Sequence, residues 1–550
     1  MSSRIRYAAV EGADEIFSPE FSNYLLGLHA EFTTRAHRLR LDRMKVLKRA
    51  VVDNELPSRS GSDDSTSAAW TVPEVPEELL KPGIEISGPA SITPMFINAL
   101  NPDRQGTRAE GYLDDDEDSA GHRLEDTIRA AINRRDAVRR TITFHDSARN
   151  RDYHIQDGPM PFFMHRERGL HLDEHDVTID GIKVPAALLG TALTLFYSGQ
   201  EQAALGQGIY FYLPKLESAE EVNWYRDVFE ASQASLPRLR HATIRGIILI
   251  ESLPAVYQME AMLHALGPYA AGLNAARWDL KASILEYIMS DPKQVWPDRY
   301  GVDIKTTPFL ANMFRRLVAV CLKHGAVPIG GMATALPSAD EEVNRMAATS
   351  IKADKEWEAA QGFIRGWVAH IYHMREAAQP FKDFFNAGQK PSVEMTDPDQ
   401  YPIALAVPDG VVTVEGTRRN IRTILEYLEG WLLGRGAKGI DSLEGKAGVH
   451  PALMEDLATA RIAVAQTAQR VIHRARAVDT EEEHSLAAVS KILDNETEDI
   501  LNLRNLDPDG TLRYRKARAI ALHWIKSYTN LEFRSLGSYT RSELNQIGGV

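Results

Sequence analysis

The sequence predicts an α/β protein built around a parallel sheet, either a (β/α)8 barrel or a doubly wound sheet. Short apolar runs recur from about residue 92 to about residue 390 and suit strands that are buried on both faces. Amphipathic segments with a helical repeat separate these runs. Polar residues follow several runs, and the carboxyl ends of parallel strands are where barrel enzymes keep their chemistry. The pattern therefore favours an enzyme over a scaffold.

The first 91 residues are predicted to form a helical segment followed by a linker. Residues 1–56 carry apolar side chains at helical spacing, among them Tyr24, Leu25 and Leu28. Residues 57–68 are polar and serine-rich, which is typical of a loop. The four prolines between residues 73 and 89 predict an extended, irregular chain.

The central segment, residues 92–390, contains the strand candidates. Four of them are PFFM at 161–164, GIYFYL at 208–213, GIILI at 246–250 and AVPI at 326–329. Helical patterns lie between them, at 253–266 and 308–324. The polar residues that end these runs include Arg166, Lys215 and Glu251.

The last segment, residues 391–550, is predicted to be a helical domain because the strand pattern fades there. Amphipathic patterns predict helices at 417–433, 451–475, 480–501 and 512–528.

Composition excludes several classes of protein. The chain has 550 residues, 44% hydrophobic and 25% charged, which is ordinary for a globular protein and unlike a disordered one. Its formal net charge is −13, so we expect no bulk attraction to nucleic acid or to an anionic membrane. A single cysteine, Cys321, excludes an intramolecular disulfide and any multi-cysteine metal site. These observations, and a start without a signal-peptide pattern, predict a cytoplasmic protein without membrane spans. They leave its oligomeric state open.

Two carboxylates at strand ends are candidate metal ligands. Glu251 follows the run at 246–250, and Asp279 ends the segment 271–279, which is predicted to be a strand followed by a loop. At the mouths of neighbouring barrel strands they could bind one Mg²⁺, which prefers one or two carboxylates and leaves room for substrate oxygens. The alternative is that each is only an acidic residue at a helix start.

A run of five acidic residues, Asp114 to Asp118, also has two interpretations. Adjacent carboxylates usually form a solvated loop, but they can also contribute to a metal site. The triplet 454–456 (MED) lies within a helical pattern and would be unremarkable alone.

Six segments, taken together and in order, resemble the shorter A-type of malate synthase. The likeness extends from roughly residue 76 to residue 475. The segments are RERGLHLDEHDVTIDG (166–181), IYFYLPKLES (209–218), IESLPAVYQMEAMLHAL (250–266), GLNAARWD (272–279), GGMATALPSADEE (330–342) and LMEDLATARI (453–462).

The resemblance implies a (β/α)8 TIM barrel with an N-terminal helical clasp and a C-terminal helical plug that carries the catalytic base. The corresponding division is 1–91, 92–390 and 391–550. It also implies the Mg²⁺-dependent condensation of acetyl-CoA with glyoxylate and water to malate and CoA, a reaction of the glyoxylate cycle.

Residue roles follow from the same resemblance. Asp456 matches the family's base, which removes a proton from the thioester methyl group, and Arg166 matches the arginine that faces the enolate oxygen. Mg²⁺ held by Glu251 and Asp279 would act as the Lewis acid on the aldehyde. The family's glyoxylate contacts match Arg166, Glu251, Ala276, Arg277, Trp278 and Asp279.

The acidic run gains a role from the resemblance. Glu117 and Asp118 match carboxylates that approach the metal's waters, and Ser119 matches a CoA contact. Pro337 is expected near the CoA tail. The run is therefore expected at the rim of the active site.

Three departures from the family pattern leave the substrate open. Residues 109–113 make a poor buried strand, Phe363-Ile364 replaces a His-Asp pair, and the loop 441–449 is enlarged. One alternative is therefore a related Claisen-type acyl-CoA condensing enzyme, or a malyl-CoA-like lyase or thioesterase, with a different substrate. Another is an inactive barrel paralogue that serves as a binding protein, although a dead site has no chemical reason to retain all four central residues: Arg166, Glu251, Asp279 and Asp456.

Overall fold

A closed barrel of eight parallel strands forms the centre of the computed structural model, which describes residues 4–59, 64–389, 392–440 and 452–549. Of the two sheet types that the sequence allows, the barrel is confirmed. The strands follow one another round the barrel in chain order. They are β2 (Gly83–Pro89), β3 (Gly111–Asp115), β6 (Phe162–Arg166), β9 (Ile209–Leu213), β10 (Ile244–Ile250), β11 (Ala270–Ala275), β12 (Val327–Ala333) and β13 (Arg365–Val368).

Two strands differ from the sequence-based expectation. The barrel begins with β2, in the stretch expected to be irregular, so the expected boundary at residue 92 falls after the first strand. Pro82 precedes that strand and Pro89 is its last residue, so neither proline removes a hydrogen bond from its middle. The prediction that residues 109–113 make a poor buried strand is wrong, because β3 begins at Gly111 and is buried throughout. Its two acidic residues are tolerated because Arg134 and Arg166 neutralise them.

Helices follow the barrel strands and cover the outside of the barrel. Buried apolar residues at helical spacing join them to the strands, as in the helix that starts at Pro308 and buries Phe309, Met313 and Leu317. The covering helices are α4 (Thr93–Leu100), α5 (Leu124–Val138), α6 (Ala186–Thr194), α7 (Gln200–Ala204), α8 (Ala219–Ser235), α9 (Leu253–Tyr257), α10 (Met259–Leu266), α11 (Arg277–Tyr287), α12 (Pro308–Lys323), α13 (Glu341–Gln361) and α14 (Met374–Asn386).

The N-terminal segment is mainly one long helix, α2 (Pro19–Asp53), which packs along the barrel. Ser18 caps its first turn and Asn54, in the left-handed conformation, ends it. The Trp224 indole on α8 donates to the Phe32 carbonyl at 3.0 Å, which fixes α2 against the barrel. The smaller elements of the N-terminal segment are β1 (Ile5–Tyr7), α1 (Ala13–Ile16) and α3 (Asp64–Ser67). The central segment adds two antiparallel pairs outside the barrel, β4 (Thr143–Asp146) with β5 (Arg151–His154) and β7 (Asp173–Ile179) with β8 (Ile182–Pro185), and β1 pairs with β7.

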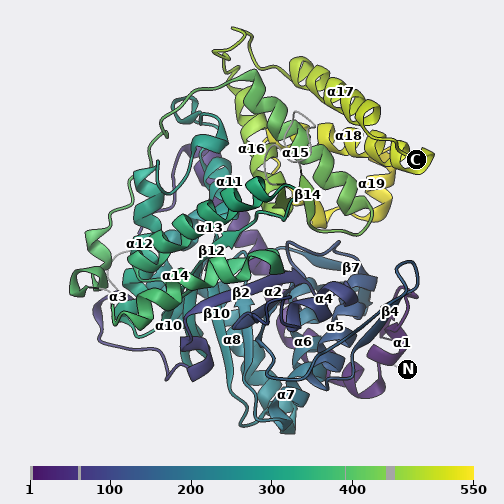
Figure 1. Cartoon of the computed structure of the whole chain (residues 1–550), viewed down its shortest axis with the longest axis vertical. Helices are drawn as coiled ribbons and strands as arrows, with labels where there is room; N and C mark the ends of the chain where they lie inside the picture. The colour runs from purple at the N-terminus through teal and green to yellow at the C-terminus, as the bar shows by residue number, and fades with distance from the viewer. Residues whose placement is uncertain (1–3, 60–63, 390–391, 441–451, 550) are drawn as a thin grey trace.

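The C-terminal helices form the domain that the sequence predicts, above the barrel in Figure 1. Two local differences concern residues 453–455, which form a strand before the helix rather than part of it, and residues 480–485, which precede the helix predicted at 480–501 because that helix begins at Leu486. Residue 451 of the predicted helix 451–475 lies outside the described residues. The Tyr528 hydroxyl donates to Glu286 on α11 at 2.7 Å, so the domain is fastened to the barrel. The elements are α15 (Val414–Leu432), β14 (Lys438–Ile440), β15 (Leu453–Glu455), α16 (Leu457–Ile472), α17 (Leu486–Leu503), α18 (Pro508–Thr529) and α19 (Arg541–Ile547).

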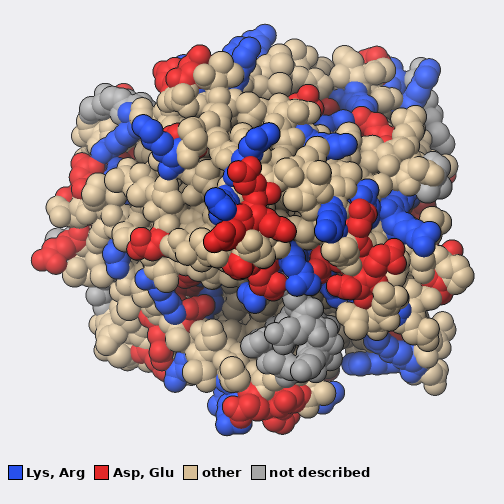
Figure 2. All heavy atoms as spheres, turned by 90° about the horizontal axis from the view of Figure 1, so that it is seen from above, with Lys and Arg blue, Asp and Glu red and all other residues tan. Residues whose placement is uncertain are grey.

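Charged side chains of both signs are spread over the surface. Figure 2 shows Asp and Glu side chains near the middle of the upper face, with Lys and Arg beside them. Within the described ranges, every helix is too short or too polar to cross a bilayer.

Candidate active site

One small pocket at the carboxyl ends of the barrel strands collects most of the predicted site residues. Its volume is about 40 Å³. Trp367 of β13 and Met454 of β15 also line it, so barrel and C-terminal domain both contribute. The predicted residues that line it are Asp118, Arg166, Glu251, Ala276, Arg277, Trp278, Asp279 and Asp456.

Three buried carboxylates form a cluster in this pocket. Asp118, Glu251 and Asp279 each offer an oxygen, and these oxygens lie within 4.8 Å of one another. Glu251 comes directly after β10, and Asp279 lies in the first turn of α11 rather than in the expected loop. Because β10 and β11 are neighbours in the barrel, the two side chains meet. Asp118, expected near the metal's waters, lies within the cluster itself.

The electrostatics of the cluster suit a divalent cation. Burial, together with Asp279 and Asp118, raises the pKa of Glu251 to about 7. Burial also raises the pKa of Asp118, whereas at Asp279 the attraction of Lys215 and Arg461 outweighs burial and lowers the pKa. Oε2 of Glu251 is buried without a hydrogen-bond partner. A set of carboxylate oxygens with an unsatisfied member fits Mg²⁺, which binds oxygen ligands.

Lys215 lies against all three carboxylates. Its ammonium nitrogen is 3.0 Å from Oδ1 of Asp118, forms a hydrogen bond to Oδ2 of Asp279 and lies 4.0 Å from Oε2 of Glu251. Its backbone N–H donates to Oε1 of Glu251 at 2.5 Å. The sequence showed Lys215 as a polar residue after a strand, the same signal that marked Glu251, but gave it no role.

Arg166, at the end of β6, is held by two acidic residues. Its Nε and Nη2 atoms bind the two carboxylate oxygens of Asp115 at 2.7 and 2.6 Å, and Nη1 is 3.1 Å from Oδ2 of Asp118. Asp115 is its direct neighbour on β3. The guanidinium carbon lies 5.4 Å from the centre of the Trp367 ring. Arg166 is therefore a fixed positive charge at the pocket.

Asp456 is the N-cap of α16. Its Oδ1 accepts from the backbone of Thr459 at 3.3 Å, and the Thr459 hydroxyl oxygen accepts from its backbone N–H at 3.1 Å. Burial, with Asp118 and Asp279 nearby, raises the pKa of Asp456 well above its usual value. The N–H of Met454 donates to the Thr334 carbonyl at 2.8 Å, which ties the preceding strand to the barrel. This bond sets Asp456 at the pocket.

All five residues of the acidic run, Asp114 to Asp118, are buried, so their interpretation as a solvated loop is wrong. Each carboxylate has a buried partner. Asp114 and Asp116 bind Arg134 at 2.6 and 2.9 Å, and Glu117 accepts from the Gly169 N–H at 2.6 Å. Burial raises the pKa of Glu117 to about 8. Only Asp118 of the run lines the pocket.

The two predicted CoA contacts lie outside the pocket lining. The backbone N–H and hydroxyl of Ser119 both donate to Oδ2 of Asp115, at 2.9 and 2.6 Å. Pro337 is exposed, next to Leu336, whose N–H donates to the Ala452 carbonyl at 2.8 Å. Their contacts with CoA remain predictions.

The segments that depart from the family pattern lie in different parts of the protein. Phe363 and Ile364 precede β13, at the end of the barrel opposite the pocket, where the Ile364 N–H donates to the Pro328 carbonyl at 3.2 Å. Trp367, four residues later, is the part of this segment that lines the pocket. The loop 441–449 lies outside the described residues. The Phe363-Ile364 change therefore does not reshape the site.

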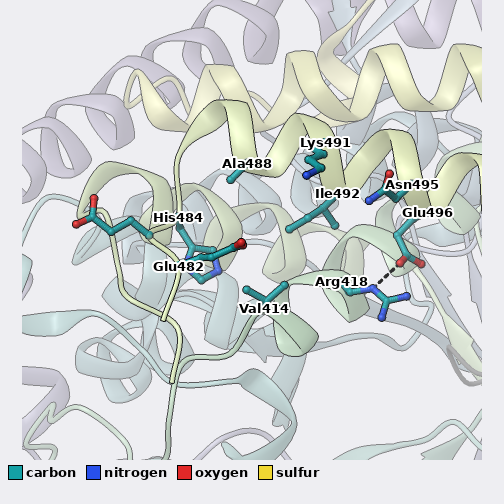
Figure 3. Close-up of a pocket in the computed structure, with 10 residues that line it drawn as sticks. Val414, Arg418, Glu482, His484, Ala488, Lys491, Ile492, Asn495 and Glu496 are labelled. Atoms are coloured by element: carbon teal, nitrogen blue, oxygen red, sulfur yellow. Dashed lines mark hydrogen bonds and ion pairs between the residues drawn. The ribbon is translucent and has the colours of Figure 1, made fainter. Parts of the chain in front are cut away.

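Larger hollows lie elsewhere. A cleft of about 640 Å³ lies beside the first residues of β6, at the other end of the barrel. A groove of about 190 Å³ lies between α15 and α17 (Figure 3), where Arg418 binds Glu496 at 2.8 Å. Neither contains a predicted site residue, so size alone does not identify the active site here.

Comparison with known proteins agrees with the geometry. Residues 162–404 match the family model "Malate synthase, TIM barrel domain", and residues 411–541 match "Malate synthase, C-terminal". The chain is 36% identical over 472 residues to malate synthase A of Escherichia coli K12, covering 84% of each chain. It is 36% identical to malate synthase of Streptomyces clavuligerus, covering 83% of each chain, and 33% identical to that of Myxococcus xanthus, covering 84% of this chain and 83% of the relative.

Proposed function

The chain belongs to the malate synthase family and is a transferase of that type, and we propose that it condenses acetyl-CoA with glyoxylate and water to release malate and CoA. One observation carries the proposal. A carboxylate that can act as base (Asp456), a fixed cation (Arg166) and a metal-binding carboxylate cluster line the same pocket. The reaction belongs to the glyoxylate cycle, and we propose that it takes place in the cytoplasm.

The three carboxylates supply the place for the metal. Glu251 and Asp279 would hold Mg²⁺, with Asp118 close enough to bind it directly or through water. When bound, Mg²⁺ supplies Lewis acidity toward the carbonyl oxygen of glyoxylate.

Asp456 is proposed as the base. A thioester methyl group is weakly acidic, so its proton is removed only by a base that is fixed against it. Capping by Thr459 fixes Asp456, and burial makes its carboxylate more basic than an exposed one. Asp456 would take the methyl proton on its carboxylate oxygen, which leaves an enolate. The enolate carbon would then attack the aldehyde to give a malyl thioester, and water would hydrolyse that thioester to malate and CoA.

Arg166 is proposed to stabilise the enolate. Negative charge moves to the thioester oxygen when the proton leaves, and a fixed guanidinium nearby lowers the energy of that state. The bidentate pair with Asp115 holds the guanidinium in place before substrate binds, so little reorganisation is needed.

The start of α11 is proposed to orient glyoxylate. Ala276 is its N-cap, Arg277 and Trp278 begin its first turn, and all three line the pocket. The first N–H groups of a helix have no partner within the helix and bind carboxylates well. The glyoxylate carboxylate would accept from them, which leaves its aldehyde toward the carboxylate cluster.

The test is thiol release from acetyl-CoA by the wild type and by Asp456→Asn. We expect release that requires both glyoxylate and Mg²⁺, and a loss of at least about a thousandfold in Asp456→Asn. Asp507→Asn is the matched control, because Asp507 is also a helix N-cap and accepts from Gly510 at 2.6 Å, far along the chain. Full turnover in Asp456→Asn would refute the assignment of the base.

A further inference from the structure

Among the residues that the structure describes, Lys215 is the one cation within 4.0 Å of every member of the carboxylate cluster. Its side chain is buried, and its ammonium lies between Asp118 and Asp279 with Glu251 at 4.0 Å. The nitrogen therefore lies against the oxygens that a metal ion would bind. Neither the family comparison nor the reaction chemistry gives this lysine a role.

The ammonium and a divalent cation are alternative partners for the same oxygens. Mg²⁺ binds carboxylate oxygens at about 2.1 Å, whereas an ammonium donates to them at about 2.8 Å. Two positive groups on the same oxygens repel strongly at this separation in a buried site. The two cations therefore compete for Oδ1 of Asp118 and Oδ2 of Asp279.

The backbone of Lys215 has a separate task. The residue has a φ of 57°, in the left-handed region that a lysine seldom adopts, and this conformation accompanies an N–H that donates to Oε1 of Glu251. Glu251 is thus oriented by the main chain of Lys215, while Asp118 and Asp279 are bound by its side chain. A change of the side chain alone leaves the Glu251 contact in place.

We propose that Lys215 is a positioning residue that holds the metal-binding carboxylates together and competes with Mg²⁺ for them, so that Mg²⁺ binding displaces the Lys215 ammonium from Asp118 and Asp279. The inference rests on the metal site in the proposed function. Its consequence is a lower Mg²⁺ affinity than the three carboxylates alone would give.

The experiment is calorimetric titration of the full-length protein with MgCl2, without substrates. Lys215→Met removes the charge and keeps an unbranched side chain, whereas Lys215→Arg keeps the charge. We expect Lys215→Met to bind Mg²⁺ about tenfold more tightly than the wild type, and Lys215→Arg to bind no more tightly. Lys438→Met is the matched control, because Lys438 also lies between two carboxylates, Glu426 and Glu429, each at 2.7 Å. Its Mg²⁺ affinity should equal that of the wild type.

A second measurement uses only the wild type, so it does not depend on whether a variant folds. In a crystal of the wild type with Mn²⁺, anomalous scattering locates the metal, and we expect Nζ of Lys215 to lie beyond hydrogen-bond distance of Oδ2 of Asp279. Mn²⁺ on the carboxylates with both Lys215 hydrogen bonds intact would overturn the proposal.

The outcomes separate this inference from the proposed function. If the wild type releases thiol but Lys215→Met binds Mg²⁺ no more tightly than the wild type, the competition between Lys215 and Mg²⁺ is refuted. The proposed reaction is then unaffected. A wild type that binds no Mg²⁺ overturns the metal site and the competition together.

Discussion

Two buried groups of charges each include part of the acidic run Asp114–Asp118, and in each group a cation lies among three carboxylates. In the first group, Arg134 binds Asp114 and Asp116 and lies 3.3 Å from Glu167. In the second, Lys215 lies against Asp118, Glu251 and Asp279. Only the second contributes residues to the pocket lining.

The different chemistry of arginine and lysine explains why the first group is structural and the second lies at the metal-binding pocket. Arginine serves several carboxylates with separate N–H groups in a fixed plane, and it keeps its charge at every pH of interest. Lysine is a point charge on a flexible stem, so another cation can take its place. The Arg134 group is therefore a permanent structural link, whereas in the Lys215 group Mg²⁺ can take the place of the ammonium.

The largest expected effect comes from breaking the permanent link. Arg134→Met leaves three buried carboxylates without their cation, and we expect the free energy of unfolding to fall by about 3–5 kcal/mol. Urea unfolding measures it. Arg139→Met is the control, since its pair with Glu201 is exposed and contributes less than about 1 kcal/mol. If Mg²⁺ restored the stability of Arg134→Met, the distinction between the two groups would be contradicted.

The second prediction removes a ligand from the Lys215 group. Asp279→Asn keeps the shape of the side chain but removes its charge, so we expect thiol release to fall at least about a hundredfold and the Mg²⁺-induced rise in Tm to disappear. Thermal unfolding with EDTA and with MgCl2 measures the second effect. Asp291→Asn, outside the pocket, should behave as the wild type. An unchanged Mg²⁺ response in Asp279→Asn would place the metal elsewhere.

The third prediction concerns Glu117, which lies in the run between the two groups. Its pKa is about 8 when folded and near 4.5 when unfolded, so the folded protein holds a proton that the unfolded chain has lost between these values. This contribution to stability is full below about pH 4.5 and is lost as the pH rises to about 8. Glu117→Gln cannot ionise at this position. We therefore expect its free energy of unfolding, relative to that of the wild type, to rise by about 1–3 kcal/mol from pH 5 to pH 8.5. Urea unfolding in EDTA at both pH values measures it, and a parallel pH dependence in both proteins would refute it.

The smallest expected effect separates two roles of Ser119. Its hydroxyl supports Asp115, which clamps Arg166, so Ser119→Ala should lose about 1 kcal/mol of stability and lower kcat several-fold. A contact with CoA would instead raise KM for acetyl-CoA and leave kcat unchanged. Steady-state kinetics with varied acetyl-CoA distinguish them.

The sequence pattern predicted parallel strands where they are continuously apolar, as at 246–250, because burial on both faces leaves that signal, and the family resemblance favoured the barrel. It missed β3 because two aspartates belong to that strand, and their arginine partners lie 20 and 51 residues away. Pairing at that separation is a property of the fold, not of the local pattern. The interpretation of Asp114–Asp118 as a solvated loop is wrong for the same reason, because the partners of these carboxylates are distant in the sequence.

The site residues were predictable to the extent that they resemble a family pattern or end a strand. Glu251 and Asp279 meet because they follow the neighbouring strands β10 and β11, and Arg166 reaches the same pocket from the end of β6. Lys215 ends a strand in the same way, but only the structure shows its ammonium among the carboxylates. The Phe363-Ile364 change drew attention in the sequence, yet its place at the opposite end of the barrel removes it from the site.

In the proposed reaction, this pocket joins the acetyl methyl carbon to glyoxylate. The most direct test is carbon NMR of the reaction of acetyl-CoA labelled with ¹³C at the methyl group, with glyoxylate and Mg²⁺, for the wild type and Asp456→Asn. We expect the label to appear in the methylene group of malate with the wild type and to stay in acetyl-CoA with Asp456→Asn. Label that appears in free acetate, or malate formed equally by the variant, would contradict it.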